Sequence, residues 1–235
     1  MGRHLAIGDI HGCFNSLCKL IEFVDVRSDD TLITLGDYVN RGPNTNAVID
    51  WLIHRHATGH LIALRGNHEI MMLNALDDEK SHIIWLDVGG RSTLSSYSPF
   101  EGDGGEISDI PDHHWYFLEN ELLPSYETDR HFFVHANAYP NMPISDQPDS
   151  MLYWEPFRFP APHVSGKTMV CGHSSQKSGL PLDHGHAVCI DTWACGRGWL
   201  TCLDVESGML WQANEAGETR GMRLEDLDSG DVREN

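Results

Sequence analysis

Gly8-Asp9-Ile10-His11-Gly12 opens a pattern that recurs twice in the first third of the sequence. Each time, a short apolar stretch typical of a strand ends in a polar loop, and a stretch with helical spacing of apolar residues follows. The strands are predicted at 5–8, 31–35 and 61–64, and the helices at 15–24, 45–56 and 67–76. Strands and helices alternating at this spacing indicate parallel strands with crossover helices, and therefore an α/β fold.

The second and third loops of this pattern also carry polar side chains, in Gly36-Asp37 and in Gly66-Asn67-His68-Glu69. Because the carboxyl ends of parallel strands face one crevice, side chains from all three loops are expected to converge. The expected set is Asp9, His11, Asp37, Asn67 and His68, joined by His135 and His173, which follow two later strands. Oxygen and imidazole ligands suit Mn²⁺, Fe or Zn²⁺ better than thiophilic ions.

The rest of the chain changes character twice. Residues 77–125 are rich in Gly and Pro, with a helix near 114–120, and are interpreted as an insertion of helices and loops over one end of the sheet. Further strands are predicted at 131–134, 168–171, 187–190, 199–203 and 209–212, the last two joined by a hairpin turn at Ser207-Gly208. Residues 1–214 are therefore expected to form a single domain, and the acidic residues 215–235 a disordered tail.

The composition is that of an ordinary globular protein, with 235 residues and 40% hydrophobic content. Acidic residues number 35 and basic residues 16, which gives a net charge of −19. Such a chain is a poor candidate for nucleic-acid binding, which needs basic surface to replace counterions. No apolar run approaches the roughly 20 residues of a membrane span, so no membrane association is expected.

The six cysteines form no Cys-x-x-Cys pair, so a thiolate zinc site is not expected and free buried thiols are. The first residues lack the long apolar segment and the small-residue cleavage site of a signal peptide. A cytoplasmic location is therefore expected.

The loops, taken in order, resemble the phosphoprotein phosphatase family of calcineurin-like metallophosphoesterases, and its bacterial serine/threonine phosphatase members more than the eukaryotic ones. The resemblance rests on Gly8 to Gly12, Gly36 to Gly42, Arg65 to Glu69, His135 and Gly172-His173. It implies a four-layer α/β/β/α sandwich with two mixed β-sheets, classed as α+β by some schemes.

The resemblance also implies a two-metal site. Asp9, His11 and Asp37 would bind the first of two divalent ions, with Mn²⁺ favoured. Asp37 would bridge to the second ion, which the resemblance assigns also to Asn67, His135 and His173. Arg41 and Arg65 would hold phosphate oxygens together with Asn67, and His68 would protonate the leaving alcohol. A hydroxide bridging the two ions would attack phosphorus.

Asn40 departs from the family pattern, which usually has Asp at this place. An aspartate there accepts a hydrogen bond from the general-acid histidine and favours its protonated form. Asn40 is expected to orient His68 through its side-chain oxygen, but it cannot stabilise an imidazolium by charge. We therefore expect a lowered His68 pKa and weaker general-acid catalysis, least harmful for substrates with good leaving groups.

Other residues have less specific signals. Arg158 is the one candidate for a further phosphate-binding arginine, with a surface role as the alternative. His184 and His186 are expected at the surface and His113-His114 at a helix start. Trp193, Trp199 and Trp211 are expected in the core, because basic residues do not interleave with them as in a base-stacking platform.

The predicted function is metal-dependent hydrolysis of phosphomonoesters, most specifically on phosphoproteins, as a serine/threonine or dual-specificity phosphatase. Its partner would be a phosphorylated protein or a small phosphoester; the oligomeric state is left open. One alternative is a dinucleoside polyphosphate (diadenosine tetraphosphate) hydrolase. A basic groove in the insertion would favour it, but that stretch holds Lys80 and Arg91 among several acids. Another is a phosphate-recognising pseudophosphatase, impaired by Asn40.

Overall fold

The computed structural model of the chain describes residues 2–100 and 104–227. The predicted parallel strands form the centre of its first sheet. This six-stranded sheet has the order β11-β10-β9-β1-β2-β3. Its strands are β1 (His4–Ile7), β2 (Thr31–Thr34), β3 (Leu61–Ala63), β9 (Leu200–Asp204), β10 (Met209–Ala213) and β11 (Thr219–Arg223). The first three run parallel, and the β9–β10 hairpin pairs antiparallel with β1, which makes the sheet mixed.

The second sheet is also mixed and has the order β4-β5-β6-β8-β7. Its strands are β4 (Ser125–Glu127), β5 (His131–Val134), β6 (Thr168–Cys171), β7 (Leu182–Asp183) and β8 (Ala187–Cys189). Strands β5, β6 and β8 are parallel, and the two outer strands are antiparallel to them. The carboxyl ends of three parallel strands therefore meet in this sheet as well.

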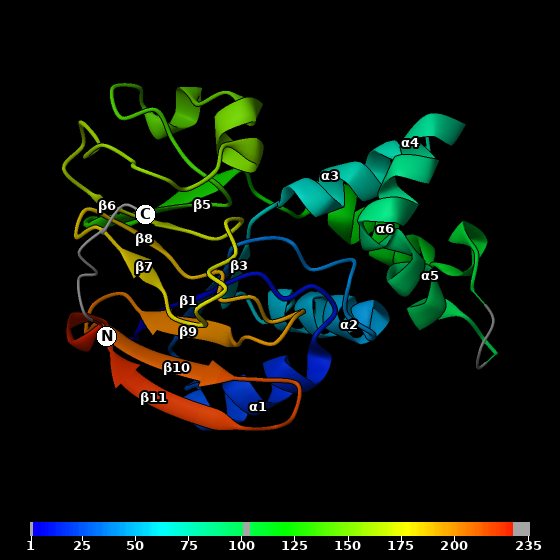
Figure 1. Ribbon diagram of the computed structural model, residues 1–235, viewed down its shortest axis with the longest axis horizontal. Coiled ribbons are helices and arrows are strands. Elements are labelled where there is room, and N and C mark those ends of the chain that lie inside the picture. Colours follow the sequence, from blue (N-terminus) through cyan, green and yellow to red (C-terminus); the bar gives the residue numbers. More distant parts are fainter. Residues whose placement is uncertain (1, 101–103, 228–235) are drawn as a thin grey trace.

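Period-two alternation along the strands builds the layers. In β1, Ala6 faces the second sheet, in a core shared with Phe133 and Val170 of the other sheet. Its neighbours Leu5 and Ile7 face the opposite way, into the core beneath helices α1 (Phe14–Val24) and α2 (Thr45–His56). Short helical turns η3 (Ile144–Asp146) and η4 (Ser150–Trp154) cover the outer face of the second sheet. The two sheets thus lie between outer helical layers, as Figure 1 shows, and the predicted sandwich with two mixed sheets is confirmed.

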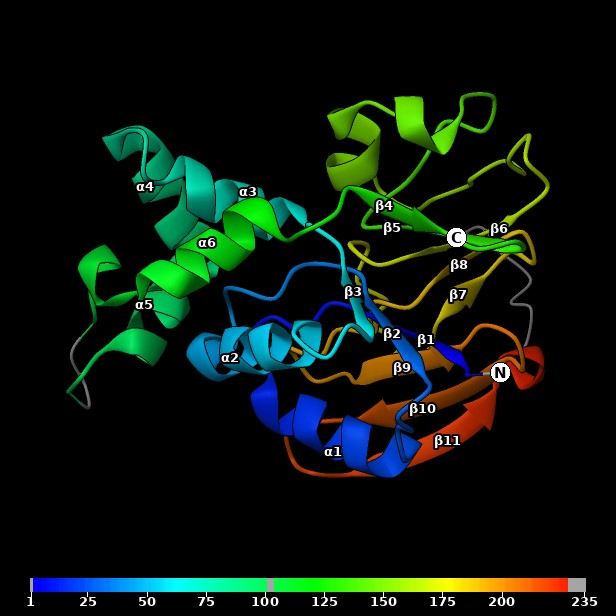
Figure 2. The same cartoon turned by 180° about the vertical axis from the view of Figure 1, so that it is seen from behind.

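The segment between β3 and β4 forms a helical lobe beside the sheets (Figure 2). We use this name for α3 (Asn67–Asn74), α4 (Glu79–Trp85), η1 (Leu86–Gly90), α5 (Arg91–Tyr97), η2 (Ile107–Asp109) and α6 (Asp112–Asn120). Backbone N–H groups of the loop after β2 donate to the lobe. Arg41 N donates to Gly89 O at 3.2 Å, and Asn40 N donates to Thr93 Oγ1 at 2.9 Å. The inserted residues therefore hold a loop that carries candidate site residues.

The C-terminal prediction needs correction. Residues 219–223 form β11, which pairs with β10 along its whole length, so the predicted disorder is wrong for residues 215–227. The remainder of the predicted tail lies outside the described residues. Strand β11 lies at the edge of the sheet, its residues are exposed or half-buried, and three of the five are polar, so its composition does not indicate a strand. Strands β4 and β7 are too short to give a periodic signal. Within the described residues, no helix is both long and apolar enough to cross a membrane.

Candidate metal centre

The strand ends bring the predicted ligands together. Asp9 and Asp37 follow β1 and β2, Asn67 begins α3 after β3, and His135 and His173 follow β5 and β6. Five of the six predicted ligands are at most 6% exposed, and His173 is half-buried. The site thus draws on both sheets, at the edge where their parallel strands end.

Asp37 lies between two groups of ligand atoms. Its Oδ2 is 3.4 Å from His11 Nε2, and its Oδ1 is 3.4 Å from His135 Nε2. Asn67 Oδ1 lies 3.0 Å from His135 Nε2 and 3.0 Å from His173 Nδ1. The ligand atoms of His11, Asp37 and His68 lie within 4.8 Å of one another, as do those of Asp37, His135 and His173. One carboxylate shared by two donor groups is the arrangement that a pair of cations needs.

Backbone carbonyls orient two of the imidazoles. His11 Nδ1 is 2.8 Å from Val39 O, and His135 Nδ1 is 2.8 Å from Leu35 O. Because a carbonyl only accepts, each Nδ1 carries the hydrogen, and each Nε2 lone pair turns toward Asp37. Such second-layer hydrogen bonds fix the tautomer of metal-binding histidines.

Asp9 is held by the backbone of the loop after β6. Both of its carboxylate oxygens lie 3.1 Å from His173 N, which donates to them. This approach requires glycine at position 172, where a side-chain Cβ would collide with Asp9 Oδ1. The Gly172-His173 pair therefore places Asp9 and His173 side by side.

The site loops are locally strained. His11, Asp37, Asn40, Arg41 and His173 are five of the seven non-glycine residues with positive φ in the described part of the chain. Side-chain-bearing residues avoid this region at a cost of about 1–3 kcal/mol each. Such strain gathers where geometry serves a site rather than stability.

The buried carboxylates of the centre would be stabilised by a nearby positive charge. Burial, together with the charges of Asp191 and Asp37, raises the pKa of Asp9 well above its ordinary value, and burial raises the pKa of Asp37 to about 7. Burial lowers the pKa of His11 to about 3 and that of His135 to about 4. The imidazoles are neutral, and the carboxylates beside them lack a full cationic partner. Divalent cations suit this set, because they neutralise the carboxylates and accept the imidazole nitrogens as ligands. The donor set therefore fits a two-metal centre.

The Asn40 side chain points the opposite way from the prediction. Trp85 Nε1, which can only donate, lies 2.9 Å from Asn40 Oδ1, and Thr93 Oγ1 donates to the same oxygen at 3.1 Å. The amide nitrogen is therefore the atom that faces His68 Nδ1, at 2.7 Å. The expectation that Asn40 accepts from His68 through its oxygen is wrong, because the lobe already occupies that oxygen.

His68 is consequently approached by donors at both ring nitrogens. Arg41 Nη2 lies 3.0 Å from His68 Nε2, while Arg41 Nη1 lies 2.9 Å from His11 Nε2. A neutral imidazole accepts at only one nitrogen. Burial, then His11 and Arg41, lower the pKa of His68, which agrees in direction with the sequence prediction. Arg41 is exposed whereas Asn40 is fully buried, so Arg41 is the partner that is able to turn away.

The other two arginines lie differently. Arg65 Nη2 donates to Leu118 O and Glu119 O at the end of α6, and within the described residues its Nε has no hydrogen-bond partner. Arg158 is exposed, but Phe157 N beside it donates to Ser174 Oγ at 2.7 Å, next to His173. Phosphate binding by Arg65 and Arg158 stays a prediction.

Two buried acids at the site were not singled out from the sequence. Glu69 accepts hydrogen bonds at 2.7–3.2 Å from the backbone of Asp37, Tyr38, Val39 and Gly66, and so ties the β2 and β3 loops together. Asp191 follows β8, accepts from Ser175 Oγ at 2.6 Å and acts electrostatically on Asp9. Asp191 could have been predicted as a site residue, because it follows a parallel strand as Asp37 does.

Residues given no site role mostly lie apart from the centre. All six cysteines are free, with Cys18 exposed and Cys195 half-buried rather than buried. His184 stacks on Phe157, and His186 Nε2 donates to Pro160 O at 2.7 Å. The predicted core placement holds only in part for Trp193, Trp199 and Trp211, which are half-buried and lie beneath Lys177, Arg220 and Arg3.

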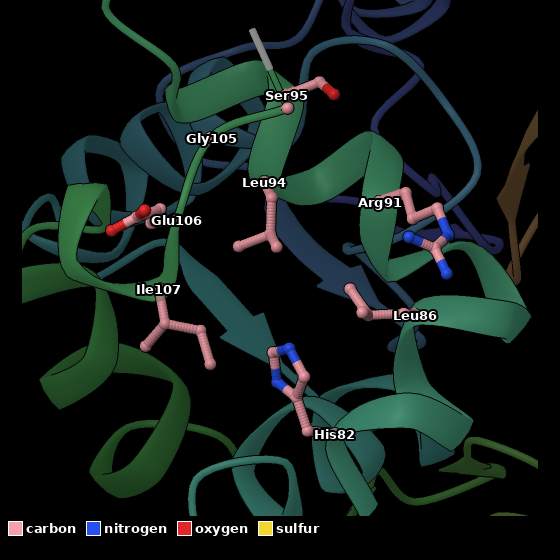
Figure 3. A pocket seen from close by; sticks show the side chains of 9 residues that line it. His82, Leu86, Arg91, Leu94, Ser95, Gly105, Glu106 and Ile107 are labelled. Atoms are coloured by element: carbon pink, nitrogen blue, oxygen red, sulfur yellow. The ribbon is translucent and has the colours of Figure 1, made fainter. Parts of the chain in front are cut away.

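A cavity of about 540 Å³ lies within the helical lobe. Figure 3 shows Leu86, Leu94 and Ile107 around it, with Arg91 and His82 at its sides. None of the residues that line it belongs to the metal centre. The cavity and the candidate centre are thus separate features.

Comparison with known proteins agrees with this geometry. Residues 2–191 match the family of calcineurin-like phosphoesterases. The chain belongs to this metallophosphoesterase family.

Curated relatives match over shorter stretches. The chain is 39% identical over 92 residues to serine/threonine-protein phosphatase 1 of Salmonella typhimurium, which covers 37% of the chain and 39% of the relative. It is 43% identical over 72 residues to a symmetrical bis(5'-nucleosyl)-tetraphosphatase of Legionella pneumophila, which covers 30% of the chain and 25% of the relative. The matched stretches thus span well under half of these relatives.

Solved structures are similar over nearly the whole chain. A candidate diadenosine tetraphosphatase has a TM-score of 0.65 at 19% identity, over 94% of this chain and 93% of its own. A cold-active protein-tyrosine phosphatase of a Shewanella species has a TM-score of 0.56 at 17% identity, over 95% and 81%. At these identities the likeness shows the fold alone.

Proposed function

We propose that the chain is a two-metal phosphohydrolase that acts best on substrates with good leaving groups. The expected order of hydrolysis rates is phosphoanhydrides of the dinucleoside polyphosphate class first, aryl phosphates such as phosphotyrosine next, and the alkyl phosphates of serine and threonine last. The observation that carries this order is the Asn40 amide nitrogen facing His68 Nδ1 at 2.7 Å.

That contact decides where His68 holds its proton. Because the Asn40 amide donates, Nδ1 of His68 must accept, and the ring hydrogen sits on Nε2, on the side of Asp37 and Arg41. An imidazolium would place a second N–H against the uncharged, donating amide of Asn40 at a buried position. His68 is therefore a neutral hydrogen-bond donor to a leaving oxygen and a poor general acid.

A weak acid matters most for basic leaving groups. An alkoxide must receive a proton as it departs, whereas a phenolate, with a pKa of about 10, or a phosphate, with a second pKa of about 6, departs as an anion. From the sequence alone, phosphoproteins are the first predicted substrates. The buried Asn40–Trp85 contact favours the dinucleoside polyphosphate alternative, and phosphoserine and phosphothreonine hydrolysis becomes the second candidate.

The remaining residues have complementary tasks. When bound, two divalent cations, Mn²⁺ being our candidate, would supply the charge that activates water and stabilises the displacement at phosphorus. Asp9, His11, Asp37, Asn67, His135 and His173 would hold them. Arg41 would turn from the two imidazoles onto phosphate oxygens, which frees His68 Nε2–H for the leaving oxygen. Arg65 and Arg158 are candidates for the distal phosphates of a polyphosphate.

A comparison of turnover on three substrates tests the proposal. Metal-stripped protein with added Mn²⁺ is given diadenosine tetraphosphate, p-nitrophenyl phosphate or a phosphoserine peptide, and kcat/KM is measured for each. We expect the peptide to be slower than the other two by about a hundredfold, the contribution of one general acid. A phosphoserine peptide turned over as fast as the anhydride would contradict the role given to Asn40. Metal binding without turnover of any substrate would instead support a pseudophosphatase.

A further inference from the structure

A second cluster of metal-ligating side chains lies in and beside the helical lobe, outside the catalytic centre. Asp50 on α2 faces His113 and His114 in the first turn of α6, and the ligand atoms of all three lie within 4.8 Å of one another. Asp50 Oδ1 is 3.0 Å from His114 Nε2 and 3.9 Å from His113 Nε2. We propose that Asp50, His113 and His114 form a peripheral site for a divalent transition ion, with Zn²⁺ as the candidate.

The spacing suits such an ion. Zinc bonds to imidazole nitrogen and carboxylate oxygen are about 2.0–2.2 Å long, so two ligands around one ion lie roughly 3–4 Å apart. Both measured distances from Asp50 Oδ1 fall in this interval. Two imidazoles and one carboxylate are also ligands that zinc takes in proteins, with a further position left for water.

His114 is built for this role more than a surface histidine would be. It is 2% exposed, and its Nδ1 lies 2.8 Å from the Tyr97 hydroxyl on α5. Without an ion, His114 Nε2 donates to Asp50 Oδ1 and Nδ1 accepts from the Tyr97 hydroxyl. When an ion binds, the tautomer with hydrogen on Nδ1 would donate to that hydroxyl and turn the Nε2 lone pair toward the position between His113 and Asp50. A second-layer partner of this kind orients a metal-binding ring.

The other two ligands make the site accessible. The Asp50 and His113 side chains are 55% and 62% exposed, so an ion can enter from solvent without any rearrangement of the core. Since Asp50 belongs to α2, which lies on the first sheet, and the histidines belong to α6, a bound ion would clamp the lobe onto the sandwich. The lobe in turn holds the Asn40 loop through Thr93.

Zinc counting by native mass spectrometry tests the proposal, and its readout does not depend on turnover. Metal-stripped full-length protein is titrated with Zn²⁺, and the number of ions per chain is followed for the wild type, His113→Ala and Asp50→Asn. Asp50→Asn keeps an oxygen for the His114 hydrogen bond, and His113 is exposed, so both variants should fold. We expect each to bind one Zn²⁺ fewer than the wild type while Mn²⁺-dependent phosphate release is unchanged.

His54→Ala is the matched control. His54 is exposed on the same helix, and its Nδ1 lies 2.7 Å from the Asp50 backbone oxygen, but it is not part of the cluster. This variant should keep the full zinc count. Equal counts in the wild type, His113→Ala and Asp50→Asn would overturn the proposal, and loss of the ion in His54→Ala would overturn the ligand assignment.

Discussion

The position of the Asn40 side-chain oxygen, set by Trp85 and Thr93, determines which hydrogen bond His68 receives. The oxygen of Asn40 is surrounded by the donors Trp85 Nε1 and Thr93 Oγ1, and a carboxylate in its place could also accept from His68 Nδ1. We expect Asn40→Asp to raise kcat on alkyl phosphates about tenfold or more, since an imidazolium then gains a charged partner. Hydrolysis of p-nitrophenyl phosphate should change much less. Equal effects on both substrates at every pH would contradict this account.

Trp85 offers a second test of the same contact without a change of charge. Trp85→Phe removes one of the two donors to the Asn40 oxygen and leaves only the Thr93 hydroxyl, so the amide can turn its oxygen toward His68 more readily. We expect activity on alkyl phosphates to rise severalfold relative to p-nitrophenyl phosphate, with some loss of stability from the smaller ring. Trp115→Phe in α6 is the control, because Trp115 packs against the same core from the lobe, although it is only partly buried, and it is not among the hydrogen-bond partners of Asn40. A uniform fall in both activities would mean that Trp85 only supports packing.

The sequence could predict which residues gather at the strand ends, but not the orientation of the Asn40 amide. Asp9, Asp37, His135 and His173 could be predicted as site residues, because each is a polar residue shortly after a strand and the topology brings the strand ends together. The partners of Asn40 come from positions 85 and 93, in an insertion whose docking no local pattern encodes. That contact is purely tertiary, and it reverses the hydrogen bond that the motif alone implies.

At the scale of elements, Glu69 in the first turn of α3 links two strand loops. It is fully buried and satisfies four backbone N–H groups that would otherwise lack partners. Glu69→Ala should lower the free energy of unfolding by about 4 kcal/mol or more, because each of the four buried unsatisfied donors costs roughly 1–3 kcal/mol. Urea unfolding of the metal-free protein measures this loss. The exposed Glu79→Ala in α4 serves as control and should change stability by less than about 0.5 kcal/mol; a similar loss in both variants would refute the linking role.

Element boundaries were predictable wherever a strand is buried or a helix is amphipathic. Helix α2 and strands β5 and β6 occur over the predicted residues, because α2 buries one face and the buried strands form short continuous apolar runs. Strand β11 escaped prediction because its side chains are exposed or half-buried, so that pairing with β10 rather than burial defines it.

For the whole molecule, the buried carboxylates couple folding to metal binding. Without cations, burial raises the pKa of Asp9 and raises that of Asp37 to about 7, from an ordinary value of 3.8. Between about pH 4 and 7 these two carboxylates keep protons in the folded chain that the unfolded chain has released, so their contribution to the stability of the metal-free protein falls as pH rises. Cations bind the ionised carboxylates and remove this loss. The stabilisation by Mn²⁺ should therefore grow with pH.

Thermal unfolding at two pH values measures this coupling. We expect the increase in Tm on adding saturating Mn²⁺ to be larger at pH 7.5 than at pH 5.5, by about 5 °C. Asp37→Asn, which removes the shared carboxylate, should abolish most of the difference. An Mn²⁺ effect that is independent of pH would show that these carboxylates do not bind the ions.

Mn²⁺-dependent phosphate release from p-nitrophenyl phosphate tests the central claim most directly. The substrate has a leaving group that needs little help from His68, so the assay isolates the two-metal chemistry from the Asn40 effect. Metal-stripped protein should be inactive, and added Mn²⁺ should restore turnover that is lost in Asp37→Asn and His135→Ala. Turnover that is equal with and without metal, or that survives both substitutions, would contradict the account.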